Sequence, residues 1–387
     1  MLATTVQRVR SFGRQVAKSA VITVADQVRG IAGTPLASCK PLAADIVAGV
    51  CPGLDPADYK HSFAVKETIP DDGVTVPHRP IDTFHLVLDT RDPRYSCRNH
   101  VVIGPGNTVL YEDSIPFKEM SVRSRVLERP RRIGGTVGYL SNTDPGNYYH
   151  WLCFMLPLLR TYRERIGVEP DYLYIGRPIQ PFHLESLALA GIGPERVLSE
   201  AVSGDRLVAD FADRKRRDGA IDRSMLAFSR SLHYRAPQTR PSRRLFIGRA
   251  KSTHRRLANE NACLERATCH GFEPVRMDGR SVIEQARLVA EAEMIIAPHG
   301  AALANLLFAT PGAQVLELLP ARPTAAVPID APLLTAFREI AAFVGCRYHY
   351  VMGETLPEHR HLPQSHADFS VPIDEFEAML AAMLDAA

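Results

Sequence analysis

The order of strand-like and helix-like segments in the second half of the chain constrains the fold most. Short apolar runs typical of buried strands alternate there with helix patterns. In chain order they are a strand at 244–247, a helix at 260–269, a helix from 281 to about 291, a strand at 294–297, a helix at 302–308 and a strand at 314–318. Gly271 ends the first helix, and Ser281 with Glu284 forms a capping box that starts the second. This alternation predicts the α/β class, in which helices cover a parallel sheet.

The first half combines a similar alternation with a hairpin signal. Strands are predicted at 84–88, 101–103, 109–111, 172–175 and 196–198, and helices from Tyr148 and at 182–190. Residues 104–107 are turn formers, so the strands on either side of them should pair. Pro157 should bend the helix that begins at Tyr148. We therefore expect a second α/β region here.

The length of 387 residues suits two α/β domains with an extension. A net charge of only +3 gives no reason to expect a nucleic-acid partner. A charged run at 213–218 and a Pro-containing linker at 237–242 lie between the two halves. We predict an N-terminal segment at 1–34, an N-terminal domain at 35–236, a C-terminal domain at 243–350, and a tail with a helix at 351–387.

Cysteine usage and hydropathy bear on the compartment. The seven cysteines are odd in number and form no C-x-x-C pair, which favours a reducing environment. No stretch reaches the roughly 18 apolar residues of a membrane span, and the N-terminus lacks a secretion signal. We therefore expect a cytoplasmic protein. The basic amphipathic pattern of residues 1–34 either docks on the anionic inner face of the membrane or packs on its own domain as a terminal helix.

A candidate site lies where the strand at 294–297 meets the helix at 302–308. His299, Gly300 and Ala301 join the two, and ligands bind at this edge of open α/β sheets. Small residues would let a phosphate approach the free amides of the first helical turn. His299 would then donate to a phosphate oxygen, or stay neutral and orient one. The alternative is a tight turn with a structural histidine.

Charged residues gather near the same edge. Glu317 ends an otherwise buried strand and needs a partner, either the hydroxyl pair of a nucleotide ribose or an internal arginine. Arg249, His254, Arg255 and Arg256 follow the first strand of this half. Arginine suits bidentate phosphate binding, although such a cluster also occurs as solvated surface.

In order and spacing, these residues resemble glycosyltransferase family 61. The matching positions are Arg249, Arg255-Arg256, Asn259-Glu260, Gly271-Phe272, 281–285, 298–305, Pro311-Gly312 and 315–318, with residues 147–152 as the upstream signature. The resemblance implies a GT-B architecture of two Rossmann-like domains, with the acceptor side at 35–236 and the nucleotide sugar at 243–350. It assigns the donor to Arg249, Arg255, Asn259, Glu260, His299, Gly300, Ala301, Asn305 and Glu317.

One position departs from the family pattern. The upstream signature usually continues with a glutamate and ends Leu-Pro-Arg, whereas this chain has Phe154 and then Leu156-Pro157-Leu158. An acceptor-side or catalytic carboxylate is therefore missing from its usual place. This departure leaves the acceptor class open and raises the alternative of a catalytically silent nucleotide-sugar-binding subunit.

The resemblance implies inverting transfer to a glycan or glycolipid acceptor, in the synthesis of a bacterial capsule, lipopolysaccharide or exopolysaccharide. The chain contains no D-x-D, so we expect neither a metal ion nor a cofactor. His150 is one candidate for the base that takes the acceptor proton, and Asp144 is the other. His150 could instead be a structural partner of Tyr149 and Trp151. A nucleotide-sugar epimerase or hydrolase on the same fold is a further alternative.

Overall fold

The computed structural model describes much of the chain from Ile81 onward. The described residues are 81–88, 100–103, 109–113, 131–141, 146–176, 179–200, 202–209, 221–249, 252–320, 332–362 and 366–386. The predicted basic segment at 1–34, the charged run at 213–218 and the candidate base Asp144 lie outside them. Among the described helices, none has both the length and the apolar run needed to cross a bilayer.

The chain divides into two compact units, and each is described here by itself. The first lies within Met1–Trp151, Met155–Leu184 and Ile192–Arg214, and the second within Leu152–Phe154, Glu185–Gly191 and Lys215–Ala387. The predicted domain bounds stay a prediction. Both units contain a sheet with parallel strands, so the α/β class is confirmed.

The sheet of the first unit is mixed. Its strands are β1 (Ile81–Leu88), β2 (His100–Ile103), β3 (Val109–Asp113), β4 (Arg131–Arg132), β5 (Thr136–Tyr139), β6 (Tyr172–Tyr174), β7 (Val197–Leu198) and β8 (Val202–Ala209), in the order β3-β2-β1-β8-β5-β6-β7 with β4 beside β8. The predicted hairpin is confirmed, because β1, β2 and β3 pair antiparallel. Strands β8, β5, β6 and β7 pair parallel. Strand β8 joins the two halves and was not predicted, because Ser203-Gly204-Asp205-Arg206 interrupts its apolar pattern.

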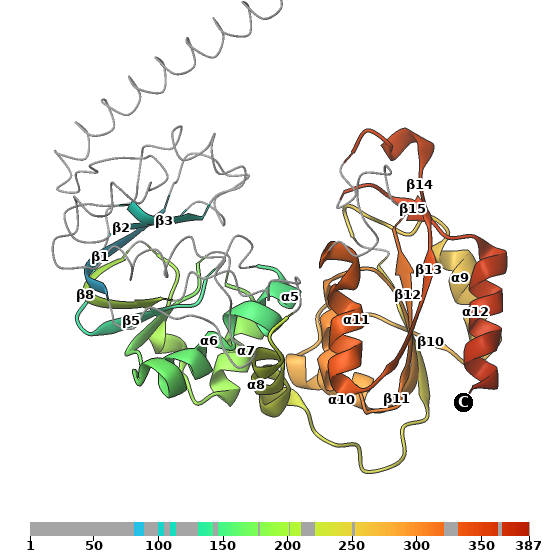
Figure 1. The fold of residues 1–387 in the computed structure, drawn as a ribbon, viewed down its shortest axis with the longest axis horizontal. Coiled ribbons are helices and arrows are strands. Elements are labelled where there is room, and N and C mark those ends of the chain that lie inside the picture. The colour runs from blue at the N-terminus through green and yellow to red at the C-terminus, as the bar shows by residue number, and fades with distance from the viewer. Residues whose placement is uncertain are drawn as a thin grey trace, which may run out of the picture. The chain divides into compact units, whose positions relative to one another are not determined.

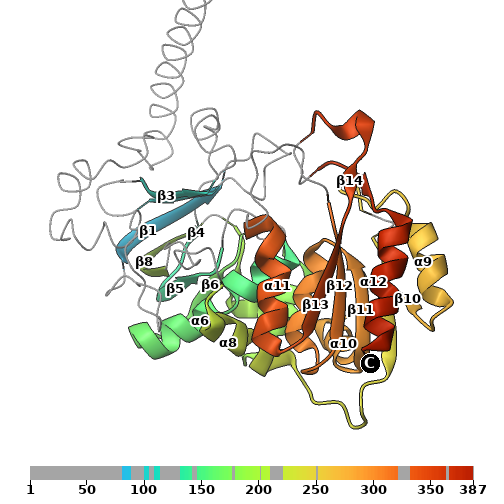
Figure 2. The same ribbon diagram turned by 45° about the vertical axis from the view of Figure 1, so that its right-hand side comes forward.

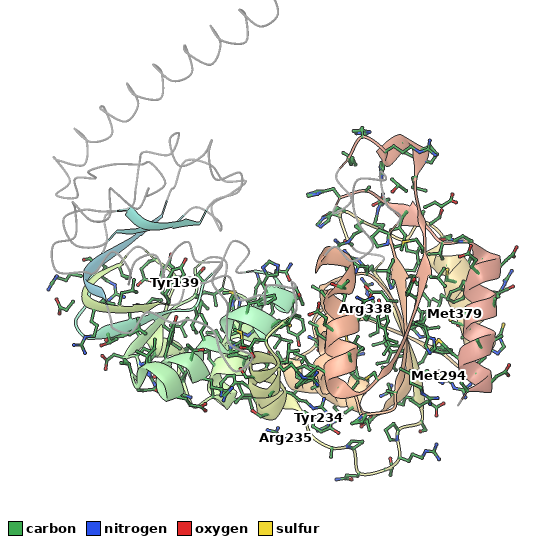
Figure 3. All side chains as sticks on the ribbon, in the orientation of Figure 1. Tyr139, Tyr234, Arg235, Met294, Arg338 and Met379 are labelled. Carbon is green, nitrogen blue, oxygen red and sulfur yellow. The ribbon has the colours of Figure 1, made fainter. Side chains whose placement is uncertain are left out.

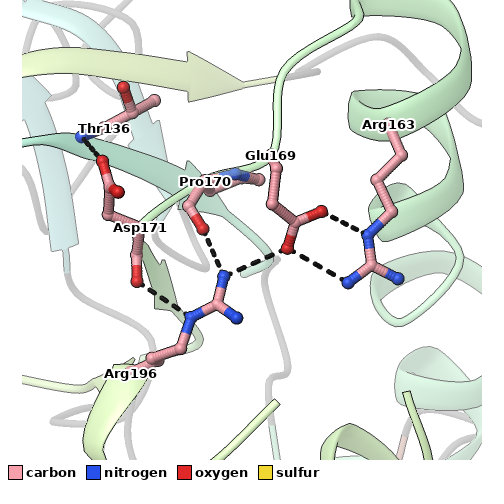
Figure 4. Close-up of polar contacts among 6 residues, drawn as sticks. All are labelled: Thr136, Arg163, Glu169, Pro170, Asp171 and Arg196. Carbon is pink, nitrogen blue, oxygen red and sulfur yellow. Dashed lines mark hydrogen bonds and ion pairs between the residues drawn. The ribbon is translucent and has the colours of Figure 1, made fainter. Parts of the chain in front are cut away.

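Helices and a polar network support the parallel half of this sheet. The helical segments in this part of the chain are α5 (Tyr148–His150), η2 (Trp151–Met155), α6 (Leu158–Arg160), η3 (Thr161–Ile166), α7 (Pro181–Leu189) and η4 (Pro194–Arg196). The middle of η2 and the second half of α7 belong to the second unit. Figure 4 shows Glu169 between Arg163, at 2.5 Å, and Arg196, at 3.0 Å. Arg196 also donates to the carbonyl of Asp171, whose carboxylate accepts from the amide of Thr136 at 2.7 Å. These contacts hold Asp171, directly before β6, against Thr136 at the start of β5.

The second unit is built on a fully parallel sheet. Its strands are β9 (Arg243–Ile247), β10 (Glu273–Val275), β11 (Ala292–Pro298), β12 (Gln314–Leu319) and β13 (Arg347–Met352), in the order β10-β9-β11-β12-β13. Adjacent strands all run parallel. The predicted strands at 244–247, 294–297 and 314–318 are confirmed. Chain order places β10 on one side of β9 and β11 on the other, so the topology reverses between β9 and β11.

Helices lie on both faces of this sheet, with α10 and α11 on one side and α9 and α12 on the other (Figure 1 and Figure 2). The helices of the unit are α8 (Arg223–His233), α9 (Glu260–Thr268), α10 (Val282–Ala290), η5 (Ala301–Phe308), α11 (Pro332–Val344), η6 (Pro357–His359) and α12 (Ile373–Asp385), and a small ladder joins β14 (Glu354–Thr355) to β15 (Phe369–Ser370). The capping box at Ser281 is confirmed.

The tail helix α12 completes the core on one face of the sheet. Phe376, Leu380 and Met383 are buried against strand residues that include Met294, and Met379 packs at the edge of the same cluster (Figure 3). The side-chain amide of Gln314 also donates to the carbonyl of Met383 at 2.7 Å. The helix predicted in the tail is therefore an integral part of the second unit.

Candidate functional site

The candidate site lies at the carboxyl ends of β9 and β11, where the strand order of the second unit reverses. Gly248 and Arg249 follow β9, and His299 and Gly300 follow β11. Helices on opposite faces of the sheet leave a crevice at such a switch point, which is the usual ligand position in open α/β sheets. The topology therefore places the residues of the sequence motif at the expected edge.

Gly300 makes room for the guanidinium of Arg249. A methyl group built on Gly300 would overlap Nη1 of Arg249 and lie 2.9 Å from its Cζ. Nη1 donates to the carbonyl of His299 at 2.5 Å, and Nη2 donates to the hydroxyl of Ser252 at 2.9 Å. The sequence predicted that the missing side chain lets a phosphate approach the amides directly. In this structure, the space is filled by an arginine side chain.

The helix after Gly300 also differs from its prediction. Residues Ala301–Phe308 form a 3₁₀ helix, η5, and the amide of Leu303 already bonds to the carbonyl of Gly300 at 2.9 Å. A 3₁₀ turn leaves fewer free amides at its start than an α-helix does. Arginine side chains must therefore supply most of the positive charge at this edge.

Arg255 is the second cation of the site. Its backbone is left-handed, with φ of 52°, a conformation that costs a non-glycine residue about 1–2 kcal/mol. Its amide donates to the carbonyl of His366 at 3.2 Å. Burial and the charge of Arg249 lower the pKa of Arg255 to about 10, although Glu317 opposes the shift. The Nε atoms of both arginines are buried and have no hydrogen-bond partner among the described residues.

Two histidines lie beside this pair of arginines. The rings of His254 and His366 stack with centroids 5.2 Å apart. Burial lowers the pKa of His254, and the charges of His366, Arg255 and Arg249 lower it further, against the opposing effect of Asp368. The local potential is therefore positive enough to disfavour a further proton, which is the condition that favours an anion.

Glu260 and Asn259 bond to the backbone around the loop that carries Arg249. Both carboxylate oxygens of Glu260 accept from the amide of Arg249, at 3.1 and 3.0 Å. The side-chain amide of Asn259 donates to the carbonyl of Val371 at 2.8 Å, and its oxygen accepts from the amide of Val371 at 3.1 Å. Both side chains therefore act on the backbone of the chain itself.

Asp368 fixes the other side of the same loop. Its buried carboxylate accepts from the amide and from Nε of Arg256, both at 2.8 Å. Burial alone would raise the pKa of Asp368, but these hydrogen bonds and the charge of Arg256 lower it below its usual value. Arg256 is consequently held in an ion pair, whereas Arg249 and Arg255 form none with any residue that the structure describes.

A buried chain of hydrogen bonds lies behind the motif histidine. His299 and Glu317 are 3% and 0% exposed, and Nδ1 of His299 lies 2.5 Å from Oε1 of Glu317. The hydroxyl of Tyr348, on β13, donates to Oε2 of Glu317 at 2.5 Å. The sequence suggested a ribose or an arginine as the partner of Glu317, and the observed partners are an imidazole and a phenol. Tyr348 was missed because no local pattern marks it.

Asn305 lies deeper in the unit, below the turn. Its side-chain nitrogen donates to Oε1 of Gln285 at 2.9 Å and to the carbonyl of Ala302 at 3.0 Å. Gln285 in turn donates to the carbonyl of Arg280 at 3.0 Å. Asn305 thus links η5 to the start of α10.

The upstream signature begins a helix that contains two π-helical stretches. The side chain of Asn147 caps the helix by accepting from the amides of Tyr149 and His150, at 3.0 and 3.4 Å. His150 is half-buried, and its ring contacts that of Tyr149 with centroids 5.7 Å apart. Phe154 is buried in the core. The structural alternative for His150 is thus supported by its contact with Tyr149, and Asp144 lies outside the described residues.

Comparison with known proteins gives one family. The family model described as Glycosyltransferase 61 matches residues 148–316. A search of curated proteins gives no match. The matched range begins at the capped helix, includes Arg249, Arg255 and His299, and ends one residue before Glu317.

Proposed function

Because its match over residues 148–316 makes this chain a glycosyltransferase of family 61, we propose that it moves a sugar from a nucleotide-sugar donor to a glycan or glycolipid acceptor. We further propose that transfer inverts the anomeric configuration, needs no metal ion or cofactor, and serves the synthesis of a bacterial surface polysaccharide. The donor is proposed to bind at the carboxyl edge of the sheet of the second unit.

The pair Arg249 and Arg255 carries this proposal. The charge of Arg249 lowers the pKa of Arg255, and both side chains are largely removed from solvent. Two neighbouring cations with unused buried Nε–H groups are costly unless an anion binds between them. A diphosphate supplies two adjacent anionic groups, and arginine binds such groups with parallel hydrogen bonds.

The proposed transfer is a displacement at the anomeric carbon of the donor. The acceptor hydroxyl oxygen forms a bond to the anomeric carbon while the bond from that carbon to the diphosphate oxygen breaks. The acceptor proton passes to a base, for which His150 and Asp144 remain the candidates. Arg249, Arg255 and His299 stabilise the charge that develops on the leaving diphosphate. Glu260, Asn259, Asn305 and Glu317 act as positioning residues, and Gly300 and Ala301 keep the turn narrow.

The two units would correspond to the halves of a GT-B enzyme. We propose that the acceptor side lies in 35–236 and the nucleotide-sugar side in the Rossmann-like region 243–350, to which the tail 351–387 adds a helix. A cytoplasmic location is supported by the free thiols of the four described cysteines. The segment 1–34 would then give peripheral contact with the inner membrane.

A second candidate is a silent subunit that binds nucleotide sugars. It is favoured by Phe154, which fills the core at the position where the family pattern has a glutamate. An epimerase or hydrolase would instead consume the donor without an acceptor. Product analysis with and without acceptor separates the three.

The test is a binding screen of nucleotide sugars by saturation-transfer NMR in the presence of EDTA. We expect wild type to bind at least one donor, and Arg255→Gln to weaken that binding about 10- to 100-fold, since a charge-assisted contact is lost. Arg287→Gln removes the same charge from an exposed position on α10 and should bind as wild type does. Equal binding by Arg255→Gln and wild type, or no binding to any nucleotide sugar, contradicts the proposal.

A further inference from the structure

A buried carboxylate with two donors lies behind the turn that carries His299. Glu317 is fully buried on β12, which lies between β11 and β13, and on the side of the sheet that α11 covers, since the ring of Phe337 on that helix lies 5.2 Å from the ring of His299. An ionised carboxylate in such a place is tolerated only if both oxygens are hydrogen-bonded. His299 bonds Oε1, and Tyr348 bonds Oε2, both at 2.5 Å.

Tyr348 can act only as a donor in this arrangement. Burial, the charge of Glu317 and the hydrogen bond to it raise the pKa of the Tyr348 phenol far above its usual range. The phenol therefore keeps its proton at neutral pH. With Oε2 engaged, the carboxylate group cannot rotate freely, and Oε1 stays directed at the imidazole.

The direction of these hydrogen bonds determines which ring nitrogen of His299 carries the proton. A carboxylate oxygen accepts, so Nδ1 of His299 carries the proton that lies between them. The opposite nitrogen, Nε2, makes no hydrogen bond to a described residue. It is therefore the ring nitrogen left to face an incoming phosphate oxygen, to which it donates when it carries a proton.

We propose that Tyr348 is a positioning residue for sugar transfer: its hydroxyl holds Glu317, and through Glu317 it sets the tautomer and orientation of His299. The inference rests on the proposed function of His299 at the leaving diphosphate. Tyr348 itself touches neither donor nor acceptor. Tyr348 therefore stabilises the transition state, in which charge develops on the leaving group, more than it strengthens binding of the donor in the ground state.

Tyr348→Phe tests this inference by removing one oxygen atom. We expect kcat to fall about 10- to 100-fold while KM for the donor changes less than about threefold, because the interaction lost is one that strengthens in the transition state. The ring ¹⁵N signals of His299 in the free protein should show a single protonated Nδ1 in wild type and a mixture of tautomers in the variant. Tyr350→Phe is the matched control, because Tyr350 lies two residues along the same strand and is 44% exposed.

A double variant separates positioning from a general structural effect. If Tyr348 acts through Glu317, Tyr348→Phe should change kcat less than about twofold in a Glu317→Gln background. If Tyr348→Phe alone does not fold, the double variant can still be measured. Glu317→Gln removes the buried charge that needs the Tyr348 hydroxyl as a second donor. Circular dichroism establishes folding of each variant.

Three results would overturn the inference: unchanged His299 signals in Tyr348→Phe, unchanged kcat, or a full-sized kcat loss in the Glu317→Gln background. The NMR measurement needs no substrate, so it judges the link from Tyr348 to His299 even if wild type transfers no sugar. In that case the proposed function fails, whereas the hydrogen-bonded chain is tested separately.

Discussion

Gly300→Ala would test how the glycine of the motif contributes to donor binding. The backbone at Gly300 is extended, with φ of 174°, so alanine can adopt it without strain. The methyl group would, however, overlap Nη1 of Arg249 and approach its Cζ and Cδ to 2.9 and 3.3 Å. The guanidinium must therefore move away from the turn.

The size of the effect follows from the contact that is lost. Nη1 of Arg249 donates to the carbonyl of His299 at 2.5 Å, and this bond positions the guanidinium at the proposed phosphate site. Hydrogen bonds to a charged group are worth about 1.5–3 kcal/mol. If the displaced arginine no longer meets the phosphate, the donor Kd should rise by about 10- to 150-fold.

Calorimetric titration with the donor found in the binding screen measures this change. Gly134→Ala is the control, because a methyl group there meets no atom within 4 Å. The decisive comparison is made in an Arg249→Ala background. If the methyl group acts by displacing Arg249, Gly300→Ala should there cost less than about 0.5 kcal/mol. An equal loss with and without Arg249 would refute this reasoning and restore the simpler idea that phosphate approaches the glycine itself.

Two further predictions concern pH. The buried ring of His233 lies 2.8 Å from the carbonyl of Ser229 and 3.0 Å from the hydroxyl of Ser186. Burial lowers the pKa of His233. Below about pH 6.5 the unfolded chain therefore binds a proton at this histidine more readily than the folded chain does. The free energy of unfolding should be fully retained above about pH 6.5 and fall by up to about 1.4 kcal/mol per pH unit below it. Urea titrations at several pH values should show that this free energy depends less steeply on pH in His233→Gln. An equal dependence in variant and wild type would exclude His233 as the cause. Burial and then the cationic neighbours lower the pKa of His254, so a bound diphosphate should promote its protonation, and donor affinity should rise as pH falls through the histidine range. Calorimetry in buffers of different ionisation enthalpy should detect proton uptake in wild type and less of it in His254→Gln, whereas equal uptake in both would contradict this role.

Local patterns predicted part of the second unit: the strands at 244–247, 294–297 and 314–318 were found, whereas strands β10 and β13 and helices α8 and α11 were missed. The strand at 294–297, the capping box at Ser281 and the turn at His299 all depend on residues within a few positions of one another. Hydrophobic period and capping chemistry are encoded at that range, so the edge of the sheet that carries the site could be found from sequence.

Contacts between distant residues could not be predicted in the same way. The arginine that fills the space at Gly300 comes from 51 positions earlier in the chain, and its bond to His299 spans 50. Tyr348 meets Glu317 across 31 positions, because β12 and β13 pair in parallel. The sequence indicated that Glu317 needed a partner, but only the strand order determines which residue supplies it.

Pro157, where the sequence predicts a bend, lies directly after a widened helical turn. Proline lacks an amide hydrogen and cannot continue the regular bonding of an α-helix. The structure accommodates it with a wide π-helical turn just before it, in which the amide of Leu156 bonds to the carbonyl of Trp151 at 2.9 Å. The helix continues beyond Pro157, and the widened turn begins directly after His150. Such turns recur at functional sites, which agrees with the candidate role of this histidine.

The way in which carboxylates are used around the site explains why its positive charge remains available. Glu260 bonds to the amide of Arg249 and not to its guanidinium, Asp368 is paired with Arg256, and Glu317 is occupied by His299 and Tyr348. Each acid therefore orders the loops around the two arginines without neutralising them. Asp368 would otherwise be a natural partner of Arg249, on whose charge it has a favourable effect. The arrangement lowers the stability of the free protein, because two half-buried cations repel each other, and binding of a dianionic group, as proposed, would restore that stability. A site that only stabilised the fold would have paired these charges internally.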